Sequence, residues 1–199
     1  MAAAIDTIAE LGYGQASVAR IAERAGTSKG VILYHFSGKD ELLTELVREL
    51  VARAGAYMRP RVEAESTGVG TLRAYIESNL AFMAENRNHV VATVEIALNA
   101  RGADGSRLFD SAVGDEAVPA LERLLTHFQG TGEFRAGFDP LVMAMAVRAA
   151  IDGVASRLAQ KPEIDVGHYA RELADLFDLA TRAGVTPPGA AVTTQSAEQ

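Results

Sequence analysis

Apolar residues recur at every third or fourth position along most of the chain, and runs of alternating β-branched residues are scarce. This spacing predicts amphipathic helices rather than strands. We therefore expect an all-α protein of about nine helices. The expected helices cover residues 3–11, 17–25, 28–36, 40–58, 71–86, 88–100, 117–129, 140–161 and 166–183.

Short polar or glycine-bearing segments mark the ends of the first helices. Glycines in the segment Gly12-Tyr13-Gly14 end the first helix. Ser17 is placed to cap the second helix and Gly26 to end it, and either Thr27 or Ser28 caps the third. The second and third helices are therefore short and separated by a turn of a few residues.

The sequence also predicts where two later helices begin. The segment 37–40, Ser-Gly-Lys-Asp, resembles a capping box that opens a longer helix, and Asp139-Pro140 combines an N-cap residue with proline in the first helical position. Pro60 and the stretch 66–70 are interpreted as a boundary between two functional regions. The domains expected are 1–45, a three-helix domain whose helix pair spans 17–36, and 46–184, a larger helical domain. Residues 185–199 lack an apolar period and are expected to be a disordered tail.

The composition is that of an ordinary globular protein, with 48% hydrophobic and 23% charged residues among 199. The absence of cysteine excludes a disulfide framework, a thiolate metal site and a cysteine nucleophile. No apolar run approaches the roughly 18 to 20 residues of a membrane span, and the opening residues lack the layout of a signal peptide. We expect a cytoplasmic protein.

The net charge of −7 disfavours a nucleic-acid partner at first sight, because cationic side chains supply most of the non-specific affinity for DNA. The charge is unevenly distributed, however. Residues 20–39 contain four basic residues and one acidic residue, a local charge of +3, so the other 179 residues carry −10. The helix pair is thus a basic segment of an acidic protein.

A pair of short helices with a glycine turn is typical of a helix-turn-helix, in which the second helix enters the major groove of DNA. Ile32 and Phe36 lie four residues apart and are expected to face the core, while Ile21 and Ala25 hold the preceding helix. The outward residues of the second helix are then Lys29, Leu33, Tyr34 and His35. Ser17 and Thr27, at helix N-termini, are placed to contact phosphates. A helical hairpin without DNA-binding function is the alternative that this pattern leaves open.

The residues from Ser17 to Phe36, SVARIAERAGTSKGVILYHF, followed by SGKDELL, resemble the TetR family of bacterial regulators. The similarity extends over about 35 residues without a gap, and the preceding Leu11-Gly-Tyr-Gly also fits the family. The resemblance implies an N-terminal helix-turn-helix domain, a helical domain that binds an effector and dimerises, and repression that a small molecule relieves. The resemblance, with the outward face of the second helix, implies that DNA is contacted by Ser17, Thr27, Ser28, Lys29, Gly30, Val31, Leu33, Tyr34, His35 and Lys39.

The chain departs from the family pattern at two places. Family members commonly have tyrosine at the position of Leu33, so one hydroxyl that would bind phosphate is missing. Members also usually begin the first helix about two turns further upstream, often with basic residues that reach the DNA. Either the natural protein starts upstream of Met1, or Met1 is the true start and weaker DNA binding is expected.

Two later helices are candidates for a dimer interface. Residues 140–161 carry a large apolar face and a second face of small residues, and residues 166–183 repeat apolar residues at helical spacing. Two such helices from each of two chains would form a four-helix interface, although both could equally pack inside one monomer. The interface candidates are Ala146, Ala150, Gly153, Leu173, Leu176, Phe177 and Ala180.

Adaptable apolar residues and isolated polar residues on the middle helices are candidates for an effector pocket. Taken singly, each apolar residue is equally explained as core, and Arg148 and Asp152, four residues apart, are equally explained as an ion pair within one helix. The pocket candidates are Met58, Phe82, Met83, His89, Thr93, Phe109, His127, Phe128, Met145, Arg148 and Asp152.

The sequence supports other classes of function less well than a DNA-binding regulator. The chain has no Walker loop, no Gly-x-Ser-x-Gly elbow and no His-Glu-x-x-His motif, so an enzyme is not expected. The four histidines are scattered, and neither a metal nor a cofactor is expected. A protein-interaction module with a degenerate helix-turn-helix, or a metal- or ligand-binding enzyme, stays as the alternative. The expected partners are operator DNA, a small-molecule effector and a second copy of the chain, and no membrane.

Overall fold

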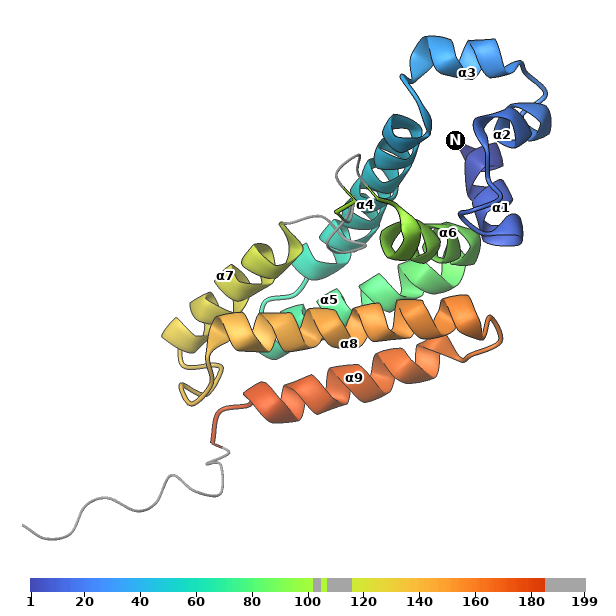
Figure 1. Cartoon of the computed structure of the whole chain (residues 1–199). Coiled ribbons are helices and arrows are strands. Elements are labelled where there is room, and N and C mark those ends of the chain that lie inside the picture. Colours follow the sequence, from blue (N-terminus) through green and yellow to red (C-terminus); the bar gives the residue numbers. More distant parts are fainter. Residues whose placement is uncertain (102–104, 107–115, 185–199) are drawn as a thin grey trace, which may run out of the picture.

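The computed structural model describes residues 1–101, 105–106 and 116–184, and within these ranges it contains nine α-helices and no strand (Figure 1). An isolated antiparallel bridge joins Phe134 and Arg182. The expected all-α class is confirmed. The helices are α1 Ala2–Leu11, α2 Val18–Arg24, α3 Lys29–His35, α4 Lys39–Glu63, α5 Gly68–Glu85, α6 Arg87–Asn99, α7 Ala117–Gly130, α8 Pro140–Gln160 and α9 Val166–Thr181.

Three predicted caps are confirmed. The hydroxyl of Ser17 accepts a hydrogen bond from the N–H of Arg20, and that of Ser28, rather than Thr27, accepts one from Val31. The Asp139 carboxylate accepts from the N–H of Val142 at 3.0 Å, with proline in the first turn. Each cap accepts a hydrogen bond from a backbone N–H group that has no partner within the helix. The first residues of these helices could therefore be predicted from the local sequence.

The predicted capping box at the start of α4 is only half formed. The N-cap residue is Gly38, which has no side chain to accept a hydrogen bond. Glu41 nevertheless reaches back, and its carboxylate accepts the N–H of Ser37 at 2.6 Å. This hydrogen bond lowers the pKa of Glu41, because it stabilises the ionised form.

The predicted end of this helix at residue 58 is wrong, because α4 continues through Pro60 to Glu63. Proline removes one backbone donor, but it lies in the last turn and is exposed, so the carbonyl that loses its partner can be hydrated. The stretch 66–70, interpreted as part of the same boundary, is partly helical. Thr67 caps α5, which starts at Gly68, three residues before the expected start.

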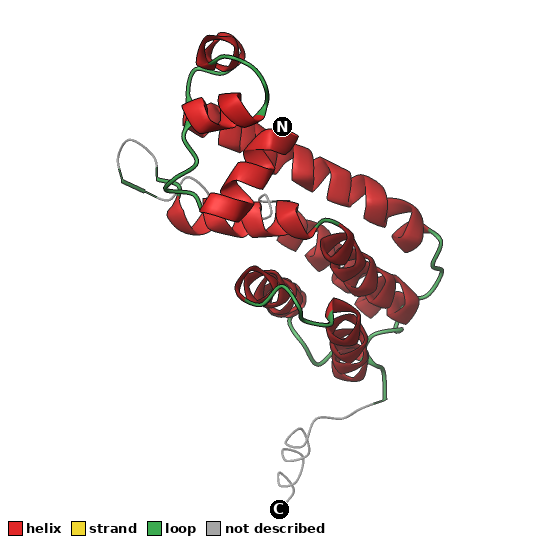
Figure 2. Ribbon diagram, turned by 90° about the vertical axis from the view of Figure 1, so that its right-hand side faces the viewer, coloured by secondary structure: helices red, strands yellow, loops and turns green. Residues whose placement is uncertain are grey.

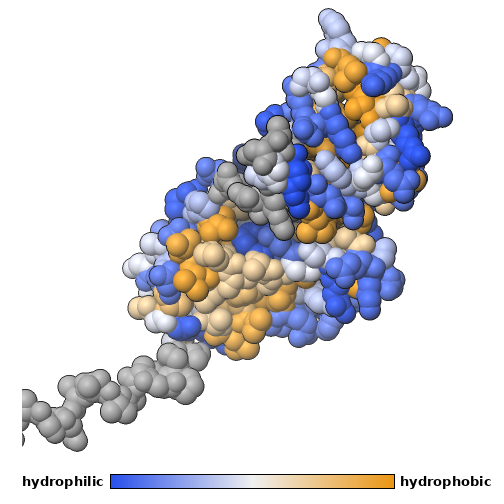
Figure 3. Space-filling model, viewed as in Figure 1, coloured by the Kyte–Doolittle hydropathy of each residue, from blue (hydrophilic) through white to orange (hydrophobic). Residues whose placement is uncertain are grey.

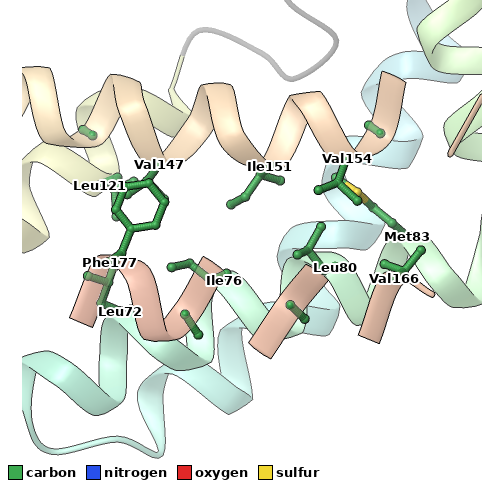
Figure 4. Packing of buried hydrophobic residues seen from close by; sticks show 14 of the residues in the cluster. Leu72, Ile76, Leu80, Met83, Leu121, Val147, Ile151, Val154, Val166 and Phe177 are labelled. Carbon is green, nitrogen blue, oxygen red and sulfur yellow. The ribbon is translucent and has the colours of Figure 1, made fainter. Parts of the chain in front are cut away.

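The helices enclose two hydrophobic cores. The body core lies between α5, α7, α8 and α9, where the ring of Phe177 of α9 points toward Val147 of α8 and Leu121 of α7 (Figure 4). The head core joins α1, α2 and α4 to α6. Its buried members are Ala4, Ile5, Ile8, Ala16, Ile21, Leu42, Leu43, Leu46, Val47, Ala92, Ile96 and Ala100.

We call α1–α3 with the first half of α4 the head, and α5–α9 the body. The head lies at one end of the molecule, with α3 outermost, and α8 and α9 lie side by side in the body (Figures 1 and 2). The helix α6 belongs to the body by sequence, yet it packs along α1 and supplies Ala92, Ile96 and its C-cap residue Ala100 to the head core. The head is therefore supported from two directions, by α4 and by α6.

Candidate functional site

The helices α2 and α3 form a helix-turn-helix. Gly26 ends α2 with φ +65°. This left-handed backbone conformation is unfavourable for residues that have a side chain, so glycine suits the position. The N–H of Thr27 donates to the carbonyl of Ala22 at 3.0 Å and closes the turn. Ile21 and Ala22 are buried on the inner face of α2, which fixes the pair on the head core.

One predicted core residue is wrong. Ala25 is exposed, because it is the C-cap residue of α2 and lies where the chain already turns toward α3. The buried alanine is Ala22, one turn earlier. Ile32 and Phe36 are half-buried against the head core, as the inward face of α3 requires.

The outer surface of α3 is open. No residue of this helix is buried, and the exposed fractions of Val31, Leu33 and Tyr34 are 49%, 42% and 86%. The rings of Tyr34 and His35 meet edge to face with centroids 5.2 Å apart. The predicted DNA contacts are brought together on one end of the head, and those that are exposed are Ser17, Thr27, Ser28, Lys29, Gly30, Val31, Leu33, Tyr34 and His35.

Lys39 is held by the head rather than extended into solvent. Its Nζ donates to the carbonyl oxygen of Tyr13 at 2.7 Å and lies 3.9 Å from the centre of the Tyr13 ring. Partial burial lowers the pKa of Lys39. The residue therefore fixes the start of α4 against the end of α1, a contact across 26 residues that local sequence patterns do not reveal. An ammonium has three N–H donors, so this anchoring leaves others to reach a phosphate.

The basic segment is less positive than its sequence suggests. Arg24 forms a bidentate ion pair with Glu10 of α1, with the Nη1–Oε2 pair 2.7 Å apart. Arg20 donates to the backbone and side-chain oxygens of Gln15 at 3.3 and 3.2 Å. Both arginines thus brace α2 against the preceding segment. Lys29 on α3 remains as the exposed cation of the outward helix.

Arg148 is the most deeply buried charge among the effector candidates. Its exposed fraction is 4%, and its guanidinium donates to the carboxylate of Asp152 at 2.5 Å and to the hydroxyl of Tyr75 at 3.3 Å. The ion pair within α8 that the spacing allowed is therefore formed. Tyr75, on α5, was missed by sequence reasoning, because nothing in the local pattern shows which residue faces Arg148 across the core.

The remaining effector candidates do not form one cluster. Phe82, Met83 and Thr93 are buried, and the Thr93 hydroxyl donates to the carbonyl of His89 within α6. Met58 and Phe128 are half-buried. His127 and Met145 lie on the surface instead of inside the body, because they fall on the outward faces of α7 and α8. Phe109 lies outside the described residues.

His89 joins α6 to α4. The guanidinium of Arg53 donates to the Nε2 atom of His89 at 3.0 Å and to the Asn86 side-chain oxygen at 3.0 Å. Burial lowers the pKa of His89, as does the positive charge of Arg53, whereas the carboxylates of Asp6 and Glu49 oppose the shift. Neutral imidazole is therefore the form that the folded protein favours, because only the neutral ring accepts this hydrogen bond.

This contact predicts acid sensitivity. Since the pKa of His89 is lower in the folded than in the unfolded chain, its contribution to stability is complete above the ordinary imidazole value of about 6.5 and is lost as the pH falls below it. We expect the free energy of unfolding to fall more steeply between pH 7.5 and pH 5 in the wild type than in His89→Gln, whose amide oxygen accepts from Arg53 without titrating. Urea denaturation at both pH values measures this, and equal slopes would remove His89 from the acid response.

The predicted interface residues on α8 and α9 fall into two groups. Phe177 is buried in the body core, so its assignment to the dimer interface is corrected; its position on α9 faces α5 and α8 within the same chain (Figure 4). Ala146 and Gly153 are exposed, Leu176 is 56% exposed, and Ala150, Leu173 and Ala180 are half-buried.

Further exposed apolar side chains extend this group. Sequence reasoning missed Val142 and Leu179, and placed Met145 in the pocket, although all three are exposed. An apolar surface covers α8 and α9 in Figure 3. We call Val142, Met145, Ala146, Leu176 and Leu179 the apolar face.

The described residues contain no group of three or more histidines and carboxylates able to hold a metal ion. Within the same ranges, no helix is long and apolar enough to cross a membrane.

A supported helix-turn-helix on a larger helical body defines the class of this protein as a helix-turn-helix transcriptional regulator. The family model for bacterial regulatory proteins of the tetR family matches residues 1–46. The first 46 residues of the chain are therefore similar to the DNA-binding domain of the TetR family.

Individual bacterial regulators are also similar to this chain. The HTH-type transcriptional regulator BetI 1 of Chromohalobacter salexigens is 38% identical over 78 residues, which span 39% of each chain. The fatty acid metabolism regulator protein of Bacillus subtilis is 25% identical over 150 residues, covering 75% of this chain and 76% of that protein. In structure, the transcriptional regulator FadR of Bacillus subtilis in complex with stearoyl-CoA matches with a TM-score of 0.77 and 22% identity, over 88% of this chain and 94% of that chain. The fold therefore matches over both head and body, whereas the family model matches residues 1–46 alone.

Proposed function

We propose that this protein is a repressor that binds operator DNA as a homodimer through α3 and is released by a small-molecule effector. The observation that carries the proposal is the open surface of α3, whose inward residues are fixed on the head core while Lys29, Tyr34 and His35 face outward. A helix of this kind, braced by a preceding helix, fits the major groove. The proposal assigns no reaction to the chain, and it places the protein in the cytoplasm, where a bacterial regulator meets DNA.

The apolar face supports the homodimer. Met145, Leu176 and Leu179 expose large apolar side chains over two adjacent helices, where small residues such as Ala146 let a second chain approach closely. Two copies of α8 and α9 would bury these side chains in a four-helix arrangement. A dimer also presents two copies of α3 to successive turns of the same DNA face, which a single head cannot do.

The body supports an effector site near Arg148. A buried guanidinium that donates to Tyr75 and Asp152 has five N–H groups, so it can donate to a polar ligand as well. Phe82, Met83 and Phe128 supply apolar surface elsewhere in the body, and the Bacillus subtilis structure described as a complex with stearoyl-CoA shows that this fold accepts a ligand in one of its members. A ligand that prefers one arrangement of α4 and α6 would move the two heads away from the spacing of the DNA grooves.

The DNA contact is tested with two substitutions on α3. Tyr34→Ala is expected to weaken binding to the DNA upstream of the chain's own gene roughly tenfold, because it removes an exposed hydroxyl and ring from the outward surface. Lys29→Ala is expected to lower the slope of log affinity against log salt by about 1. Fluorescence anisotropy across a salt series measures both.

The matched control is Lys161→Ala, which removes the same charge from an exposed position after α8. It should leave affinity and salt slope unchanged. If Lys29→Ala and Tyr34→Ala behave like this control, α3 does not contact DNA. A compound that stabilises the protein in a thermal-shift screen but leaves operator affinity unaltered would contradict regulation by an effector.

A further inference from the structure

The outward side chains of α3 have an unusual chemistry for a helix that enters the major groove. Its sequence from Lys29 to His35 contains no asparagine, glutamine, arginine, aspartate or glutamate. These side chains read adenine, guanine and cytosine through paired or directed hydrogen bonds to the base edges, and lysine can pair with guanine in the same way. Lys29 is therefore the one side chain of α3 from this group, and further base recognition by α3 must use other contacts.

Aliphatic side chains occupy much of the outward surface instead. The exposed fractions of Val31 and Leu33 are 49% and 42%, whereas Ile32, which lies between them in the sequence, is half-buried. No other part of the described chain buries these two side chains more deeply. The major-groove edge of the four bases offers one apolar group, the C5 methyl of thymine. Burial of that methyl against an aliphatic side chain is favourable because both surfaces leave water.

The positions of Val31 and Leu33 around the helix determine the directions in which their side chains point. Successive residues are 100° apart, so Val31 and Leu33 lie about 160° apart around the outward side. Gly30 and Tyr34 lie between them, and the glycine leaves room for the helix to approach the bases. The two aliphatic side chains therefore point to opposite flanks of α3, toward different base pairs.

We propose that Val31 and Leu33 read thymine at separate positions of each half-site, through apolar contact with its C5 methyl group. The proposal rests on the DNA-binding function proposed above and specifies which base that function selects. Sequence preference then comes from two aliphatic side chains, while Lys29 and Tyr34 contribute affinity.

The test first obtains a binding sequence without assuming one. The wild-type protein selects duplexes from a library with a random central region, and thymine is expected at fixed positions of each enriched half-site. Each such thymine is then replaced by uracil, which removes only the methyl group and keeps every hydrogen-bonding atom. Affinity is expected to fall about fourfold for each methyl that is contacted, as expected for one buried methyl-sized group. Fluorescence anisotropy measures the ratio of thymine to uracil affinity at every position.

Substitutions then assign the methyl groups to side chains. Val31→Ala is expected to bring the thymine-to-uracil ratio to about 1 at one position, and Leu33→Ala at another. Alanine has a higher helix propensity than either valine or leucine, so neither change should unfold α3. Leu98→Ala, at an exposed position of α6, is the matched control and should keep every ratio.

The outcomes separate the two proposals. No enrichment from the library would defeat DNA recognition itself and this inference with it. Enriched sites in which uracil binds as well as thymine would overturn the inference and leave the proposed function standing. A thymine preference that survives in Val31→Ala and Leu33→Ala would also overturn it, because other groups would then read the base.

Discussion

Leu176→Glu is expected to convert the dimer to a monomer and to weaken operator binding by about 100-fold or more. Leu176 is one of the large side chains of the apolar face. In the proposed dimer a carboxylate at this position would be buried next to the same group of the second chain, which is unfavourable, so the two chains would separate. Once the heads are separate, each binds a half-site without the high effective concentration that the second head gains from the first. That gain is typically about 100-fold to 10,000-fold.

Analytical ultracentrifugation measures the oligomeric state, and anisotropy with a two-half-site duplex measures affinity. Arg171→Glu is the matched control, since it places the same acidic group at an exposed position of the same helix outside the apolar face. It should remain dimeric. A Leu176→Glu protein that is still dimeric and still binds with wild-type affinity would show that α8 and α9 do not form the interface.

Ile96→Ala is expected to lower the free energy of unfolding by about 2 to 5 kcal/mol. Ile96 is 0% exposed and lies in the head core, where α6 packs along α1. Truncation leaves a cavity between two helices that are far apart in sequence. We also expect faster hydrogen exchange at the amides of α1, because that helix loses part of the surface that holds it.

Leu98→Ala provides the comparison within the same helix. Leu98 is two residues further along α6 and 52% exposed, so its truncation should change the free energy of unfolding by no more than about 0.5 kcal/mol. Urea denaturation of both variants gives the two values. Equal, small effects would mean that the contact between α6 and α1 contributes little to holding the head.

The helices were predictable because each depends mainly on its own residues. Ser17 and Asp139 cap the helices that follow them, and the apolar period of α8 was sufficient to predict its buried face. The errors arise where one element meets another. Phe177 fits the period of an interface helix, yet the neighbouring α5 and α8 decide that it lies in the body core.

The exposure of the residues on α3 was predicted better than the burial of the effector candidates. The outward face of α3 follows from the helical period once Ile32 and Phe36 are inward. The anchoring of Lys39 by Tyr13 and the pairing of Arg24 with Glu10 join residues that are distant in sequence, so no local pattern shows them. The effector candidates depended on knowing which side of each helix is inside the body, and His127 and Met145 proved to be outside.

The position of α6 limits how this protein can be divided. The family model ends at residue 46, but the head core is completed by Ala92, Ile96 and Ala100. A hybrid regulator that joined residues 1–46 to a foreign sensor domain would leave Ile5 and Ile8 without their partners on α6. The transplantable unit is therefore discontinuous, and an exchange of operator specificity is better made by replacing side chains on α3 than by moving the head.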